Sequence, residues 1–118
     1  MPPVTVIDPD AIENLRALSP DDDDAFLKEI LTIFLADVPE RMADLHAHRV
    51  DGNTAAFIRA AHSIKGSSSN IGASEVREIA QQIEHDSRLQ GTPVSESQIA
   101  ALEAAFARAK TVILPLLG

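Results

Sequence analysis

Apolar residues recur at helical spacing along most of the chain. Between about residues 22 and 49, positions three or four apart form one continuous stripe, because 3.6 residues per turn puts them on the same face of a helix. This main stripe comprises Leu27, Leu31, Phe34, Val38, Met42 and Leu45. A second stripe beside it comprises Phe26, Ile30 and Ile33. A helix with two apolar stripes must pack against more than one neighbour or leave one stripe exposed to solvent. Pro39 is expected to bend this helix or briefly interrupt it.

Capping and turn residues predict where the helices begin. Asp8-Pro9 combines an N-cap with proline at the first helical position. The acidic run 21–24 is expected to open the long helix, because carboxylates favour the positive end of the helix dipole. Ser95 followed by Gln98 predicts a capping box for the last helix. The predicted helices span about 8–18, 22–49, 53–70, 73–90 and 95–116.

Four long helices joined by short turns, with a short helix before them, predict an all-α fold. We expect an antiparallel four-helix bundle with a short N-terminal capping helix, forming one domain over residues 1–118. The alternative is a helical array, which would need an internal repeat, and the sequence has none.

Composition restricts the class of function. The net charge of −8 and the aromatic content of 3% argue against nucleic-acid binding, which uses basic faces and stacking aromatics. The same charge disfavours an anionic membrane surface, and no apolar run is long enough to span a bilayer. Without cysteine there is no disulfide or thiolate site. Residues 1–4 do not resemble a signal peptide, so we expect a cytoplasmic protein. We also expect it to be a monomer.

One histidine stands apart on the predicted helix 53–70. Steps of 100° per residue put Phe57, Ala61, Ile64, Ser68 and Ile71 within about 40° of one line, which marks the core face. His62 lies about 140° from that line, so its imidazole is expected to project into solvent. A neutral imidazole, with an unperturbed pKa of about 6.5, offers a nucleophilic nitrogen at physiological pH.

The neighbours of His62 suit a phosphoryl group. Lys65 lies one helical turn away, within reach of a group carried by the imidazole. Gly66 costs about 1 kcal/mol inside a helix, and the simplest reason for its presence is open space through which a partner reaches His62. The serines at 67–69 keep the surroundings small.

These residues resemble the signature of the histidine-containing phosphotransfer (HPt) family. The segment 61–73 reads Ala-His-Ser-Ile-Lys-Gly-Ser-Ser-Ser-Asn-Ile-Gly-Ala. The family pattern is Ala-His-x-[Leu/Ile]-Lys-Gly-[Ser/Ala]-[Ser/Ala], followed by a glycine six residues beyond the Lys-Gly. The resemblance implies that His62 accepts the phosphoryl group, Lys65 steadies it and Gly66 gives the partner access. It further implies that Gly72 allows close packing where the predicted helices 53–70 and 73–90 meet.

The resemblance also implies partners. It predicts a phosphorelay intermediate that takes a phosphoryl group from a receiver-domain aspartate and passes it to another receiver, with a hybrid histidine kinase as another candidate partner. The chain needs no cofactor of its own, since Mg²⁺ is expected only in the receiver. Helix four often supplies a glutamine to the second imidazole nitrogen; ungapped alignment puts Glu84 there, with Gln81 and Gln82 as competitors.

A partner needs a surface on which to dock. Transient interfaces have an apolar centre with a polar rim, so we expect an apolar face around His62. The expected docking residues are Ile12, Leu15, Phe26, Ile30 and Ser69.

Other chemistries find no support. His46 and His48 lie about 200° apart around their helix and cannot share a metal, and His85 is expected on an outer face, so we predict no metal site. No phosphate-binding loop or nucleophile elbow is present, so the chain is not expected to be an enzyme. Two alternatives stay open: a phospho-accepting domain of a larger chemotaxis-type or hybrid kinase, and a receiver-binding module that carries no phosphate.

Overall fold

Within residues 5–118 the regular structure consists of helices alone. A computed structural model describes residues 5–118, so the first four residues, where no signal peptide was found, lie outside the described part. The helices are α1 (Pro9–Ala17), α2 (Ala25–Asp51), α3 (Thr54–Ile71), α4 (Ser74–Gln90) and α5 (Glu96–Leu117). None of the helices within 5–118 is long and apolar enough to cross a membrane.

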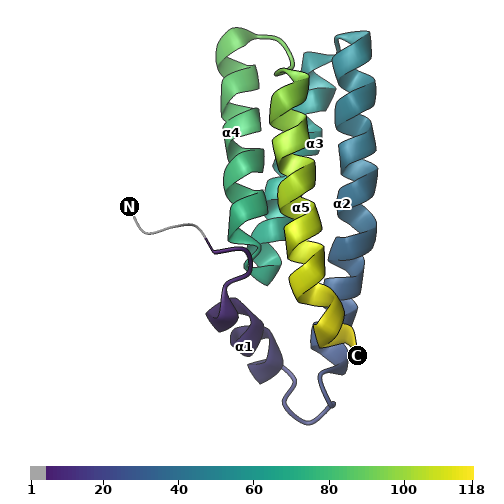
Figure 1. Cartoon of the computed structure of the whole chain (residues 1–118), viewed down its shortest axis with the longest axis vertical. Coiled ribbons are helices and arrows are strands. Elements are labelled where there is room, and N and C mark those ends of the chain that lie inside the picture. Colours follow the sequence, from purple (N-terminus) through teal and green to yellow (C-terminus); the bar gives the residue numbers. More distant parts are fainter. Residues whose placement is uncertain (1–4) are drawn as a thin grey trace.

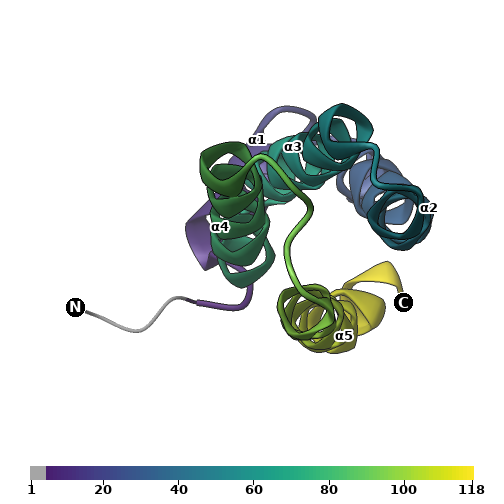
Figure 2. The ribbon, with the colours of Figure 1, turned by 90° about the horizontal axis from the view of Figure 1, so that it is seen from above.

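The four long helices run alternately up and down (Figure 1). Seen from above, α3 lies between α2 and α4, while α5 closes the bundle on the opposite side (Figure 2). The short α1 lies across the lower end, against α2 and α3 (Figure 1). The predicted fold class, an antiparallel four-helix bundle with a short N-terminal helix, is confirmed.

Local chemistry explains several helix ends. The Asp8 side chain accepts a hydrogen bond from the Asp10 backbone N–H at 2.9 Å, and Pro9 follows at the first helical position, as predicted. Asn53 caps α3 by accepting from the Ala56 N–H at 3.1 Å. Gly52, Gly72 and Gly91 end α2, α3 and α4 in the left-handed conformation, which glycine adopts without strain.

The start of α2 differs from the prediction. The helix begins at Ala25, not near residue 22, because Asp23 and Asp24 adopt left-handed φ values of 55° and 66°. Asp22 still contributes to this helix end from outside, since its Oδ2 accepts from the Phe26 N–H at 3.1 Å. The acidic run therefore forms a turn rather than the first helical turn.

Two further local expectations need correction. Of the two effects expected at Pro39, a bend or a brief interruption, the interruption is wrong, because α2 runs unbroken through this residue. Pro39 is exposed, and the buried Val38 and Met42 on either side hold the helix to the core. The capping box of α5 does not form: the Ser95 hydroxyl pairs with Ser97, and the Gln98 side chain donates to Asp86.

The core follows the predicted stripes. All six residues of the main stripe of α2 are buried, as are the five core-face residues of α3. On α4, Val76, Ala80 and Ile83 are buried, while Ile79 is only partly so. The second stripe of α2 stays partly open, because Phe26 and Ile30 are half-buried and Ile33 is 55% exposed. One face of α2 therefore remains apolar at the surface.

Gly72 fixes the position of α1. Its carbonyl accepts a hydrogen bond from the Asp8 N–H at 2.8 Å. A Cβ added at Gly72 would clash with the Cβ of Ala11 and lie 3.1 Å from that of Asp8. The glycine therefore allows α1 to approach the junction of α3 and α4 closely, whereas the sequence resemblance implied close packing of α3 and α4 with each other.

This contact predicts a stability difference between two glycine substitutions. Gly91→Ala should lower the free energy of unfolding by about 1 kcal/mol, because alanine is strained at a φ of +71° but meets open space. Gly72→Ala should lower it by about 1–3 kcal/mol more, because the added methyl group also collides with α1. Denaturant unfolding of both variants measures the difference. Equal losses would show that α1 does not pack tightly against Gly72.

Candidate functional site

The imidazole of His62 projects from the middle of α3 into solvent. The opposite face of this helix is buried, whereas the His62 side chain is 62% exposed. The predicted exposure is therefore confirmed. The backbone at His62 is anchored to the core, because the side chains of Ala61 and Ile64 are fully buried between the helices of the bundle.

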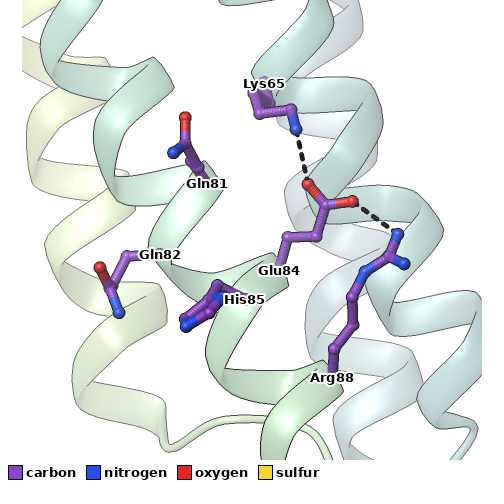
Figure 3. A pocket seen from close by; sticks show the side chains of 6 residues that line it. All are labelled: Lys65, Gln81, Gln82, Glu84, His85 and Arg88. Atoms are coloured by element: carbon purple, nitrogen blue, oxygen red, sulfur yellow. Dashed lines mark hydrogen bonds and ion pairs between the residues drawn. The ribbon is translucent and has the colours of Figure 1, made fainter.

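The Glu84 carboxylate is the centre of the site. It comes from α4 and is only 6% exposed, so it lies beneath the surface that His62 occupies. Its Oε2 lies 2.9 Å from His62 Nδ1, and its Oε1 accepts from Lys65 Nζ at 2.8 Å. Arg88, one turn further along α4, donates from Nη2 to Oε2 at 2.8 Å. Figure 3 shows Lys65 and Arg88 reaching this carboxylate from opposite sides.

These contacts keep Glu84 ionised. Burial alone would raise the pKa of its carboxyl group, because removal from water disfavours the charged form. Hydrogen bonds from Lys65, Arg88 and His62 outweigh this effect and lower the pKa from 4.5 to about 2. Near neutral pH the carboxylate therefore carries no proton and can only accept hydrogen bonds.

An ionised Glu84 determines which imidazole nitrogen carries the proton. Since the carboxylate has no hydrogen to donate, the 2.9 Å contact requires a proton on Nδ1 of His62. The neutral ring then has its lone pair on Nε2. No hydrogen bond to Nε2 is found within residues 5–118. The arrangement presents an oriented, unprotonated nitrogen at an exposed position.

The competing glutamines occupy other positions. Gln81 and Gln82 are exposed and line a hollow beside Glu84 together with Lys65 and His85 (Figure 3). Neither makes a hydrogen bond to His62; Gln82 donates to Asp86 instead. Of the three candidates from α4, only Glu84 contacts the imidazole.

Gly66 lies one turn from His62 with open space outside it. The residue is exposed, and a Cβ placed there would have no atom within 4 Å. The position therefore faces solvent rather than another helix. The next residue, Ser67, turns toward α2, where its hydroxyl donates to Asp37 at 3.3 Å.

The expected docking face is only partly at the surface. Leu15, Phe26 and Ile30 are half-buried and Ser69 is exposed, so these four remain candidates. The expectation for Ile12 is wrong: α1 turns this side chain into the core, where it is 6% exposed. Ile33 was not expected in the docking face, although it belongs to the predicted second stripe of α2. Ile33 and Ile30 line a hollow of about 80 Å³ with Ser67 and Asn70.

The other three histidines lie on α2 and α4. His46 pairs with Glu103 at 3.1 Å, His48 with Asp51 at 3.3 Å, and His85 is exposed on α4. Within residues 5–118, no group of three or more His, Cys, Asp or Glu side chains is arranged to hold a metal ion.

Comparison with known proteins agrees with this site. The model of the Hpt domain family matches residues 29–112. Among curated proteins, none matches the chain significantly. The crystal structure of histidine-containing phosphotransfer protein B (HptB) from Pseudomonas aeruginosa PAO1 superposes with a TM-score of 0.85 at 25% identity, over 98% of this chain and 96% of that one.

A second solved structure shares the fold. It is the HPT domain of an Hpt sensor hybrid histidine kinase from Shewanella, with a TM-score of 0.68 at 19% identity, over 90% of this chain and 91% of that one. Because the family model covers well over half of the sequence and includes the segment around His62, the chain belongs to the Hpt domain family of phosphotransfer modules in two-component phosphorelays.

Proposed function

We propose that this Hpt domain accepts a phosphoryl group on Nε2 of His62 from the aspartyl phosphate of one receiver domain and passes it to the aspartate of another. The observation that carries this proposal is the exposed imidazole whose Nδ1 is held by the buried Glu84 carboxylate. Family membership supports receiver domains as the partners, since Hpt domains interact with receivers.

The transfer is a displacement at phosphorus. The Nε2 lone pair of His62 forms a bond to phosphorus while the bond from phosphorus to the aspartyl oxygen breaks, and the aspartate leaves as a carboxylate with the electron pair. No proton has to move, because the hydrogen stays bonded to Nδ1 throughout and donates to the Glu84 carboxylate. Onward transfer reverses the same bonds, with the second aspartate as the nucleophile.

Glu84 and Lys65 support this step from below the imidazole. When Nε2 bonds to phosphorus, the ring becomes positively charged, and the adjacent carboxylate stabilises that charge. Lys65 holds the other oxygen of Glu84 and adds a positive charge close to the transferred group. Each residue acts from a fixed position, so little reorganisation accompanies the reaction.

The receiver supplies what the Hpt domain lacks. We propose that Mg²⁺ and the groups that activate the aspartyl phosphate belong to the receiver, and that this chain contributes a positioned nucleophile and a surface for docking. The open surface at Gly66 and the apolar residues Ile30 and Ile33 of α2 are the features that suit such a partner.

Substitution of single histidines tests this function. Incubation with a phosphorylated receiver should give acid-labile, base-stable phosphate on the wild-type chain. His62→Gln should abolish the label, because no other histidine combines exposure with a carboxylate on Nδ1 and a neighbouring lysine. The control variants His46→Gln, His48→Gln and His85→Gln should keep it. Label retained on the His62→Gln variant would refute the assignment, and an unlabelled wild-type chain that still binds the receiver would favour a module that carries no phosphate.

Substitutions of Gly66 distinguish an effect on partner access from an effect on stability. Gly66→Ala should raise the free energy of unfolding by up to about 1 kcal/mol, because glycine is the poorer helix former and no atom lies near the added methyl group. Gly66→Gln should also fold. Both should slow transfer from a receiver, the glutamine variant by about tenfold or more, because its side chain keeps the aspartate away from His62. Thermal unfolding and transfer rates of the same variants provide the measurement, and full transfer activity in Gly66→Gln would contradict the access role.

A further inference from the structure

Basic residues gather around His62 in a protein that is otherwise acidic. The chain has a net charge of −8 and ten lysines and arginines in all. Arg59, Lys65 and Arg88 all lie beside His62 or Glu84. A phosphoryl group is a dianion, so its attachment to a strongly acidic protein is opposed unless positive charge is concentrated nearby.

Arg88 lines two separate hollows, and His62 lines only one of them. This hollow of about 330 Å³ is bounded by His62, Arg59, Arg88, Ile58 and Ser63. Lys65 lines the other hollow, of about 620 Å³, together with Glu84 and the exposed face of α4. The space next to the imidazole is therefore bordered by two arginines from different helices.

The charges of these residues are unequally compensated. Lys65 and Arg88 both pair with the single carboxylate of Glu84, which leaves an excess positive charge. The Arg88 side chain is 61% exposed, whereas that of Lys65 is 28% exposed. Arg59 is exposed, and within residues 5–118 it has no ion-pair partner. Arg59 and Arg88 are thus the cations available to a new anion beside His62.

We propose that Arg59 and Arg88 form the binding site for the phosphoryl oxygens of phosphorylated His62, and that Lys65 acts as a positioning residue through Glu84. This inference rests on the proposed function of His62 as the phospho-acceptor. The guanidinium groups suit the task, because each offers a planar pair of N–H donors that matches two oxygens of a phosphoryl group. Arg59 approaches from α3 and Arg88 from α4, so the group is held from two sides.

A small phosphoryl donor tests this site without a receiver. Phosphoramidate transfers its phosphoryl group to a histidine: the Nε2–phosphorus bond forms, the phosphorus–nitrogen bond of the donor breaks, and ammonia leaves. Arg88→Gln and Arg59→Gln should each lower the initial rate of His62 phosphorylation, by up to about tenfold, the equivalent of one charge-assisted hydrogen bond. Arg88→Lys should recover part of the rate.

The matched control is Arg77→Gln. Arg77 lies on the same helix as Arg88 and pairs with Glu78, so its substitution changes the net charge equally without touching the site. The control variant should react at the wild-type rate. Added salt should slow the wild type more than the Arg59→Gln and Arg88→Gln variants, because the lost interaction is one between charges.

The possible outcomes are distinct. A wild-type chain that is not labelled on His62 would overturn the proposed function and this site with it. A labelled wild type, with Arg59→Gln and Arg88→Gln both matching the control, would overturn the arginine site and leave the proposed function intact. A loss in Arg88→Gln alone, with no loss in Arg59→Gln, would contradict the two-sided site and show that Arg88 acts through Glu84, as Lys65 does.

Discussion

The buried carboxylate of Glu84 is the interaction on which the site depends. It has three hydrogen-bond partners: His62 and Lys65 join it to α3, and Arg88 comes from its own helix α4. The contact with His62 fixes the imidazole proton on Nδ1, and the contacts with Lys65 and Arg88 keep the carboxylate ionised despite its burial. Removal of any donor would leave part of a buried charge uncompensated, which is why the group requires all of them.

The His62 imidazole lies on the outer surface of the bundle, not inside it. The core residues of α3 and α4 face inward, so the two helices hold His62 and Glu84 at fixed positions on an outer surface. Gly72 sets the approach of α1 at one end of α3, away from the imidazole. In the proposed function, a docked receiver would meet the His62 imidazole on α3, next to the open space at Gly66 and the partly exposed apolar face of α2.

Much of this fold follows from periodicity, because a helix that buries one face must repeat apolar residues at that spacing. The helix that bears His62 and the outward direction of its imidazole were predicted in this way. The start of α2 was not, since Asp23 and Asp24 adopt the left-handed conformation and the Asp24 carboxylate pairs with Arg16 of α1, which the preference of carboxylates for helix N-termini does not indicate. Ile12 was misplaced because the pattern marks an apolar stripe without showing which neighbour covers it. Arg88 was missed, although its spacing of four residues from Glu84 is the available signal.

The most direct test of the account is the protonation of His62, read by nitrogen-15 NMR of the labelled imidazole before and after phosphorylation. With the neutral ring, the account predicts a hydrogen on Nδ1 and a bare Nε2, and in the phosphorylated protein it predicts phosphorus on Nε2 with the Nδ1 hydrogen retained. In Glu84→Gln, where a neutral amide replaces the carboxylate, the hydrogen on Nδ1 should be held less firmly. A neutral His62 with its hydrogen on Nε2, or phosphorus bonded to Nδ1, would contradict the central role of Glu84.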